Sequence, residues 1–171
     1  MRSEIKAAGA AALLLLLASC GYQSARPGAG EQGWCVESGD EPATHPQAVA
    51  ALEFGVRDAL AAHALLASCD GGPTLRIQVV DVRFESMGVV ASEQAAHSRA
   101  TRVSVSAVGH VLGEGEPQDV GMVEEHYVVG TGATAASQQH VLEAGVVTAA
   151  RRAGEALVKR LLGEPVPGAP P

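Results

Sequence analysis

Three segments of the chain alternate apolar and polar side chains with a two-residue period, and this pattern restricts the possible folds more than any other. They span residues 74–85, 99–112 and 120–129. Such a period is typical of β-strands that have one covered face. The second and third segments flank an acidic turn at residues 113–119, so they predict an antiparallel hairpin with one apolar side.

The first alternating segment changes phase near its middle. Leu75, Ile77 and Val79 share one phase, whereas the apolar residues from Val80 onward follow the opposite one. A shift by one residue moves every side chain to the other face of a strand. The pattern therefore predicts a β-bulge, a sharp twist, or a strand whose halves are covered on opposite faces. Residues 86–98 lack periodicity and are expected to form a mobile loop.

Two further segments have apolar residues at the three- and four-residue spacing of an amphipathic helix. The first covers about residues 44–68, with Thr44 as its expected N-cap. The second covers about residues 134–162, with Thr134 or Ser137 as its expected N-cap. Each helix is expected to bury one apolar stripe.

A short β-type run from Trp34 to Glu37 precedes the first helix and predicts an edge strand. The order is then strand, helix, strand, strand, strand, helix (β-α-β-β-β-α). This order predicts an α+β fold with two helices packed on one face of a small mixed four-stranded sheet. We expect a single domain over residues 33–162, followed by a disordered Pro-rich tail over residues 163–171.

The N-terminus has the features of an export signal. Arg2 and Lys6 precede an uninterrupted apolar stretch at residues 7–18. A helix of that length rises about 18 Å, whereas the hydrocarbon core of a bilayer is about 30 Å thick. The stretch is too short to span a membrane, so residues 1–19 are expected to be a signal peptide.

The signal ends in Leu17-Ala18-Ser19-Cys20, which resembles the lipobox of bacterial lipoproteins. The resemblance implies that the Cys20 thiol receives a diacylglyceryl group and that the new amine receives a further chain such as palmitate. The alternative to lipidation is an ordinary signal peptide in which Cys20 happens to lie near the cleavage site. Gly21 follows in place of the Asp that retains lipoproteins at the inner membrane, which favours a periplasm-facing outer-membrane anchor. Residues 20–32 then form a lipidated flexible tether.

The net charge argues against one class of function, and the cysteines favour a disulfide bond. The net charge is −7, which argues against sequence-independent binding of nucleic acid, since such binding needs a basic surface. Apart from Cys20, the only cysteines are Cys35 and Cys69. An even pair in an oxidising compartment favours a disulfide, and two separate buried thiols are the alternative.

No nucleophile–base pair, metal-ligand set or phosphate-binding loop can be recognised in the sequence. His110 and His126 lie nearly symmetrically about the acidic turn, so they could face each other and bind a metal with Glu124. Exposed strand histidines are the commoner interpretation. We therefore expect a protein that is not an enzyme and that has no cofactor or metal.

The start of the mature chain and its element order resemble a known family. Cys20-Gly21-Tyr22 is followed by a strand, a helix and three strands reading LRIQVVDVRF, VSVSAVGHV and HYVV, then by a long helix. This arrangement resembles the LptE family of LPS-assembly lipoproteins, from Cys20 to about Leu162. The chain lacks the P-x-N stretch often found in the first strand region of the family, and the Cys35/Cys69 pair is not a general family feature.

The resemblance implies a function without catalysis. Proteins of this family plug the LptD β-barrel of the outer membrane, assist its assembly and aid delivery of lipopolysaccharide to the cell surface. Phosphates of lipopolysaccharide would contact Arg83, Arg99 and Arg102, for which ordinary solvated charges are the alternative interpretation. Competing functions are an auxiliary lipoprotein of an ABC-type lipid-trafficking system, a pilotin-like chaperone of a secretion pore, and a periplasmic enzyme.

Overall fold

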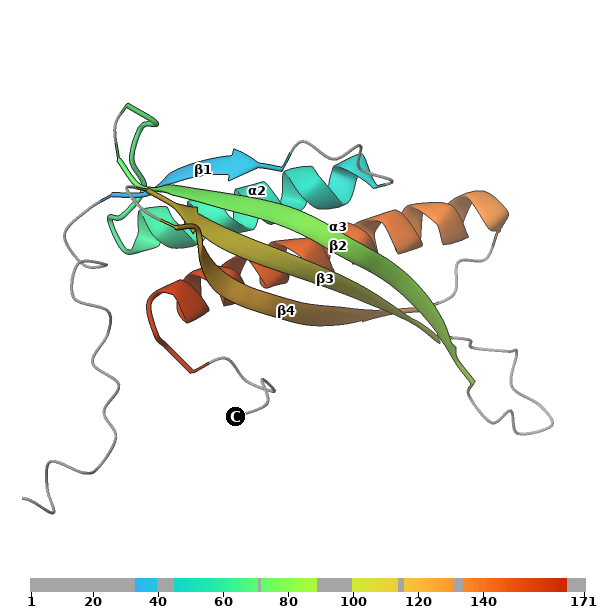
Figure 1. Ribbon diagram of the computed structural model, residues 1–171. Coiled ribbons are helices and arrows are strands. Elements are labelled where there is room, and N and C mark those ends of the chain that lie inside the picture. The colour runs from blue at the N-terminus through green and yellow to red at the C-terminus, as the bar shows by residue number, and fades with distance from the viewer. Residues whose placement is uncertain are drawn as a thin grey trace, which may run out of the picture.

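A computed structural model describes residues 33–39, 45–70, 72–88, 100–113, 116–130 and 134–165. The expected α+β fold is confirmed, with four strands and two helices in the predicted order (Figure 1). The elements are β1 (Cys35–Ser38), α2 (Pro46–Ala62), β2 (Thr74–Met87), β3 (Ala100–Leu112), β4 (Gln118–Val129) and α3 (Ala135–Leu161).

The sheet has the strand order β1-β2-β3-β4. β1 pairs with β2 in parallel, and the other two pairs are antiparallel, so the sheet is mixed as expected. Both helices lie on the same face of the sheet (Figure 1). α2 packs against β1 and β2, whereas α3 packs against β3 and β4. We call the helix-covered side the inner face and the other side the open face.

The phase change in β2 is a β-bulge at Val80. Val79 pairs with Ala107 and Asp81 with Ser106, which leaves Val80 without a partner and half exposed to solvent. The extra residue returns the later apolar residues of β2 to the inner face, because Val82 pairs with the buried Val105. Of the three predicted alternatives, the bulge is therefore the one adopted.

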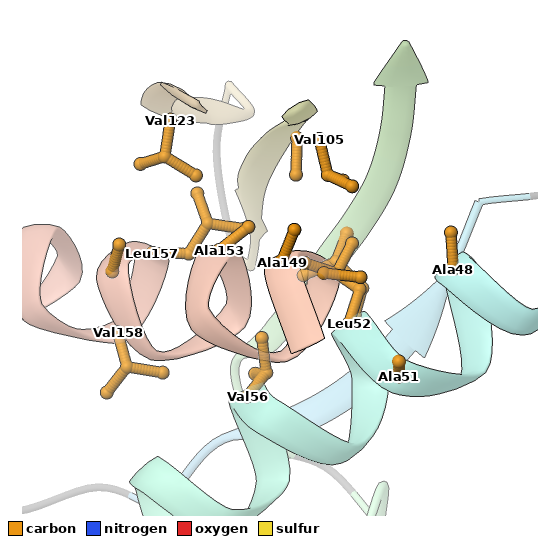
Figure 2. Close-up of a cluster of buried hydrophobic side chains, with 14 of the residues drawn as sticks. Ala48, Ala51, Leu52, Val56, Val105, Val123, Ala149, Ala153, Leu157 and Val158 are labelled. Atoms are coloured by element: carbon orange, nitrogen blue, oxygen red, sulfur yellow. The ribbon is translucent and has the colours of Figure 1, made fainter. Parts of the chain in front are cut away.

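The core consists of aliphatic side chains and alanines between the sheet and the helices (Figure 2). Figure 2 shows Leu52 and Val56 of α2 beside Ala149 and Ala153 of α3, with Val105 of the sheet above them. Such small side chains allow two helices to approach closely while each still covers the sheet. Apolar burial of this kind contributes about 25 cal/mol per Å² of surface removed from water.

The two helices touch through their backbones at two glycines. A Cβ atom added at Gly55 of α2 would lie 2.2 Å from the carbonyl oxygen of Arg151. One added at Gly154 of α3 would lie 2.5 Å from the carbonyl oxygen of Leu52. Neither position has room for a side chain, so the glycines fix how closely α2 and α3 cross.

The predicted end of the first helix is wrong. The 44–68 pattern predicts a helix to about Ser68, but α2 ends at Ala62, and Ala64 takes a left-handed backbone conformation with φ 57°. The following residues run alongside β1, where Trp34 and Leu66 form an isolated bridge. The N-cap is also different, since His45 occupies that position without a side-chain capping bond and Thr44 lies outside the described residues.

The predicted start of the second helix is confirmed. Thr134 is the N-cap of α3, and its hydroxyl oxygen accepts a hydrogen bond from the backbone N–H of Ser137. The Ser137 hydroxyl accepts one in return from the Thr134 N–H, which completes a capping box. Both candidate residues thus take part in one cap, which satisfies two backbone donors at the helix start.

Both ends of the described chain lie at the same end of the sheet. β1 begins beside Thr74, the first residue of β2, which in turn pairs with the last residue of β3. The last turn of α3 reaches the first residues of β4, because an Arg160 guanidinium N–H donates to the carbonyl oxygen of Met122. The end of β2 and the start of β3, where Met87 pairs with Ala100, lie at the opposite end of the sheet (Figure 1).

Candidate functional site

Neither described helix covers the open face of the sheet, and the middle of this face is polar. Val103 and Val105 of β3 are fully buried on the inner face, so the alternate residues Ser104 and Ser106 point to the open face. The register places charged and polar residues of the neighbouring strands on either side of these serines. The strip they form consists of Asp81, Arg83, Glu85, Arg102, Ser104, Ser106, Glu124 and His126.

Two serines in the central strand are nearly buried although no helix covers them. Ser104 is 6% exposed and Ser106 is 7% exposed, because longer side chains on β2 and β4 flank them. The strict alternation of residues 101–107 could have revealed these serines as open-face positions, but the predicted site contained only arginines.

The structure brings together two of the three arginines expected to contact lipopolysaccharide. Arg83 pairs with Ser104 across the β2–β3 register and lies diagonally from Arg102, which pairs with Glu85. Both arginines lie on the open face, whereas Arg99 lies outside the described residues. Side chains on the same face at this separation are close enough for one ligand to contact both.

Each of these arginines already has an acidic partner. Arg83 binds the Asp81 carboxylate, and Arg102 lies 3.6 Å from the Glu85 carboxylate. The exposed fractions of the four side chains range from 38% to 62%, so water and salt screen both pairs. The strip is consequently charged but nearly balanced, unlike a surface that attracts polyanions.

The register does not bring His110 and His126 face to face, which was the less favoured of the two interpretations. His126 pairs with Ser104, and His110 pairs with Asp119, whose carboxylate lies 3.9 Å from His110 Nδ1. The turn lies nearer to β3 than the midpoint of the two histidines does, and a β-bulge lies between Gly109 and His110. The partner of His126, Ser104, therefore lies six residues before His110 in β3. The two imidazoles cannot share a metal ion with Glu124.

The structure joins Cys35 and Cys69 in a disulfide, with a separation of 34 residues and a Cα–Cα distance of 4.8 Å. The bond ties β1 to the segment after α2. Together with Glu37, these cysteines are the only cluster of three metal-ligand side chains found within the described ranges. Disulfide sulfurs are not thiolates, and Glu37 lies 3.6 Å from Arg76, so the cluster has a structural role.

The last predicted site is the lipidation site at Cys20. Cys20 and residues 1–32 fall outside the described residues, so lipidation stays an expectation from the sequence. Neither of the two described helices is long and apolar enough to cross a membrane.

Comparison with known proteins yields similarity of fold. No family model matches the sequence, and no curated protein matches it. Among solved structures, rare lipoprotein B from Shewanella oneidensis is 15% identical, with a TM-score of 0.49 over 77% of this chain and 95% of that one.

Two other solved lipoproteins are similar in the same way. A lipoprotein from Caulobacter crescentus is 20% identical with a TM-score of 0.40, and the match covers 78% of this chain and 93% of that one. A minor lipoprotein from Acinetobacter baumannii is 14% identical with a TM-score of 0.42, over 94% of its length and 75% of this chain. At these identities and TM-scores the likeness carries no statement about activity or partners.

Proposed function

We propose that the protein is a non-catalytic outer-membrane lipoprotein that plugs a β-barrel of the LPS-translocation type, helps it assemble and so aids delivery of lipopolysaccharide. The observation that carries this proposal is the open face, a sheet surface with a polar middle that neither helix of the described chain covers. The lumen wall of a wide barrel is polar, and a domain that fills it must present polar groups to it. The lipobox and the LptE-like sequence pattern support the same function.

The balanced charge of the open face fits a plug better than a receptor for a free polyanion. Asp81 and Glu85 neutralise the two arginines within the same strip. Contact between lipopolysaccharide phosphates and Arg83 or Arg102 would require these ion pairs to open. We therefore propose packing against the barrel wall as the main role, with phosphate contact secondary to it.

Photo-crosslinking from the open face tests the proposed partner. A photoreactive amino acid in place of Ser104 would lie in the middle of the open face, and one in place of Val147 of α3, which is 42% exposed, is a matched control on the opposite side. In intact cells, we expect the first to give a crosslink to a large outer-membrane β-barrel. A crosslink to a secretin or to an ABC permease complex instead would replace this proposal with the pilotin-like or lipid-trafficking alternative.

Labelling with radioactive palmitate tests the anchor separately. We expect incorporation into the wild-type chain and none into Cys20→Ala. Labelling of the variant, or a wild-type chain without label, would contradict lipidation at this position. Quantification of lipopolysaccharide bound to the wild-type protein and to Arg83→Gln with Arg102→Gln tests the phosphate contact.

A further inference from the structure

The sheet has two outer edges, one formed by β1 and, beyond Ser38, by the second half of β2, and the other formed by β4. An edge strand exposes backbone N–H and C=O groups that can pair with another chain, and folded proteins usually block them. On β1, the Trp34 N–H donates to the Leu65 carbonyl, and the Trp34 carbonyl accepts from the Ala67 N–H. The next outward carbonyl, that of Val36, accepts from the Arg57 guanidinium at 3.1 Å.

The beginning of β4 is blocked in a similar way. The carbonyl oxygen of Met122 accepts a hydrogen bond from Arg160 of α3 at 2.7 Å. The neighbouring Gly121 has φ 98° and lies beside a register shift, which bends the edge at this point. An arginine from a helix thus closes one outward carbonyl on each edge strand.

The second half of β4 has no such protection. Because backbone groups of a strand alternate in direction, those of Glu124, His126 and Val128 point away from β3, as the Met122 carbonyl does. Within the described chain, no donor or acceptor reaches these outward groups. Residues 124–128, which we call the open edge, therefore form a ready template for one additional strand.

The side chains of the open edge indicate the chemistry of that strand. Glu124 points to the open face and Glu125 to the inner face, and neither has an ion-pair partner among the described residues. The guanidinium carbon of Arg152 lies over the Tyr127 ring, 5.2 Å from the ring centroid. Val128 is 47% exposed. Basic residues opposite the glutamates and an apolar residue opposite Val128 would match this pattern.

We propose that the open edge binds an extended segment of a partner protein by β-strand addition, and that this segment is basic opposite Glu124 and Glu125. Backbone hydrogen bonds to the three outward residues would supply affinity, and the two carboxylates would supply selectivity. The net charge of −7 disfavours a second copy of the same chain as the occupant. The proposal does not depend on the barrel function, since any protein with such a segment would satisfy it.

A peptide tests the proposal directly. The probe is acetyl-Thr-Val-Thr-Thr-Lys-Lys-Thr-amide, which in an antiparallel pairing places valine opposite Val128 and lysines opposite Glu125 and Glu124. The full chain, purified in detergent and labelled with ¹⁵N, is titrated with the peptide. We expect shifts confined to β4 and its neighbours, and slower hydrogen exchange at the outward amides. For the same peptide with two glutamates in place of the lysines, we expect the affinity to be at least about tenfold lower.

One substitution separates edge pairing from general attraction between charges. His126→Pro removes an outward N–H that β3 does not use, so the fold should be retained and peptide binding lost. Glu124→Lys with Glu125→Lys should reverse the preference between the two peptides. Equal binding of the lysine peptide to His126→Pro, or no shifts in β4 at millimolar peptide, would overturn the proposal. Concentration-dependent dimers abolished by His126→Pro would replace the partner segment with a second copy.

Discussion

The crossing of α2 and α3 leads to the sharpest stability prediction, which concerns Gly154→Ala. The added methyl group would lie 2.5 Å from the Leu52 carbonyl oxygen and 2.7 Å from the Val56 nitrogen. Both are backbone atoms of α2 and cannot rotate away. Since unstrained contacts between heavy atoms lie near about 3.5 Å, the two helices would have to separate by about 1 Å at the crossing.

Two opposing effects set the size of the change. Inserting an extra carbon into a well-packed core costs about 1–3 kcal/mol, and the rigid neighbours favour the upper end. Replacing glycine by alanine within a helix stabilises it by about 1 kcal/mol. The free energy of unfolding should therefore fall by about 2 kcal/mol, which corresponds to a decrease of about 1 M in the urea midpoint if the m-value is about 2 kcal/mol/M.

Urea denaturation followed by circular dichroism measures this difference. Gly145→Ala is the matched control in the same helix, because its added methyl group would meet side-chain atoms of Val129 and Val103, at 2.9 and 3.0 Å, and no backbone atom of α2. We expect this control to lose less stability than Gly154→Ala, since a side chain can shift more readily than the backbone of a packed helix. A Gly154→Ala protein as stable as the control would refute the close backbone contact. Gly55→Ala combined with Gly154→Ala should cost less than the sum of the two, because both separate the same helices.

Three further predictions concern single contacts. Replacing Cys35 and Cys69 by alanine should lower the free energy of unfolding by about 3–4 kcal/mol, and a reductant should affect only the wild type in the same urea assay. Thr134→Ala should cost about 1 kcal/mol, whereas Thr134→Asp should retain most of the cap; an unchanged thermal midpoint for the alanine variant would contradict the capping box. Arg151 binds the Asp58 carboxylate at 2.8 Å and lies over the Phe54 ring, but these groups are exposed. Arg151→Ala should therefore lower the free energy of unfolding by about 1 kcal/mol or less. A decrease above about 2 kcal/mol would contradict the small contribution expected of an exposed pair.

Local periodicity predicted the elements of this fold well, and contacts between distant segments account for the errors. The phase change at Val80 can be seen in the sequence because alternation is a property of adjacent residues. The end of α2 could not be predicted, because Leu65 and Leu66 continue the apolar spacing beyond Ala62. Those leucines instead run beside Trp34, which lies about thirty residues earlier in the chain.

The candidate site was predictable only in part for a related reason. The sequence placed Arg83 and Arg102 in two different strands, but their common face and the Arg102–Glu85 pair follow from the β2–β3 register and its bulge. His110 and His126 do not face each other because the β3–β4 pairs are centred about three residues nearer to β3 than the midpoint of the two histidines, and the bulge accounts for only one residue of the offset. The unguarded edge at residues 124–128 depends on where Arg160 reaches, which no local pattern encodes.

The placement of both described chain ends at one end of the sheet has a practical consequence for engineering. A fluorescent protein or affinity tag fused after residue 165 would emerge at the same end of the sheet as Gly33, where the described part of the chain begins. The far tip of the sheet, at the Met87–Ala100 pair, would stay clear of the fusion. C-terminal fusions should thus report on the location of the protein without obstructing whatever approaches that tip.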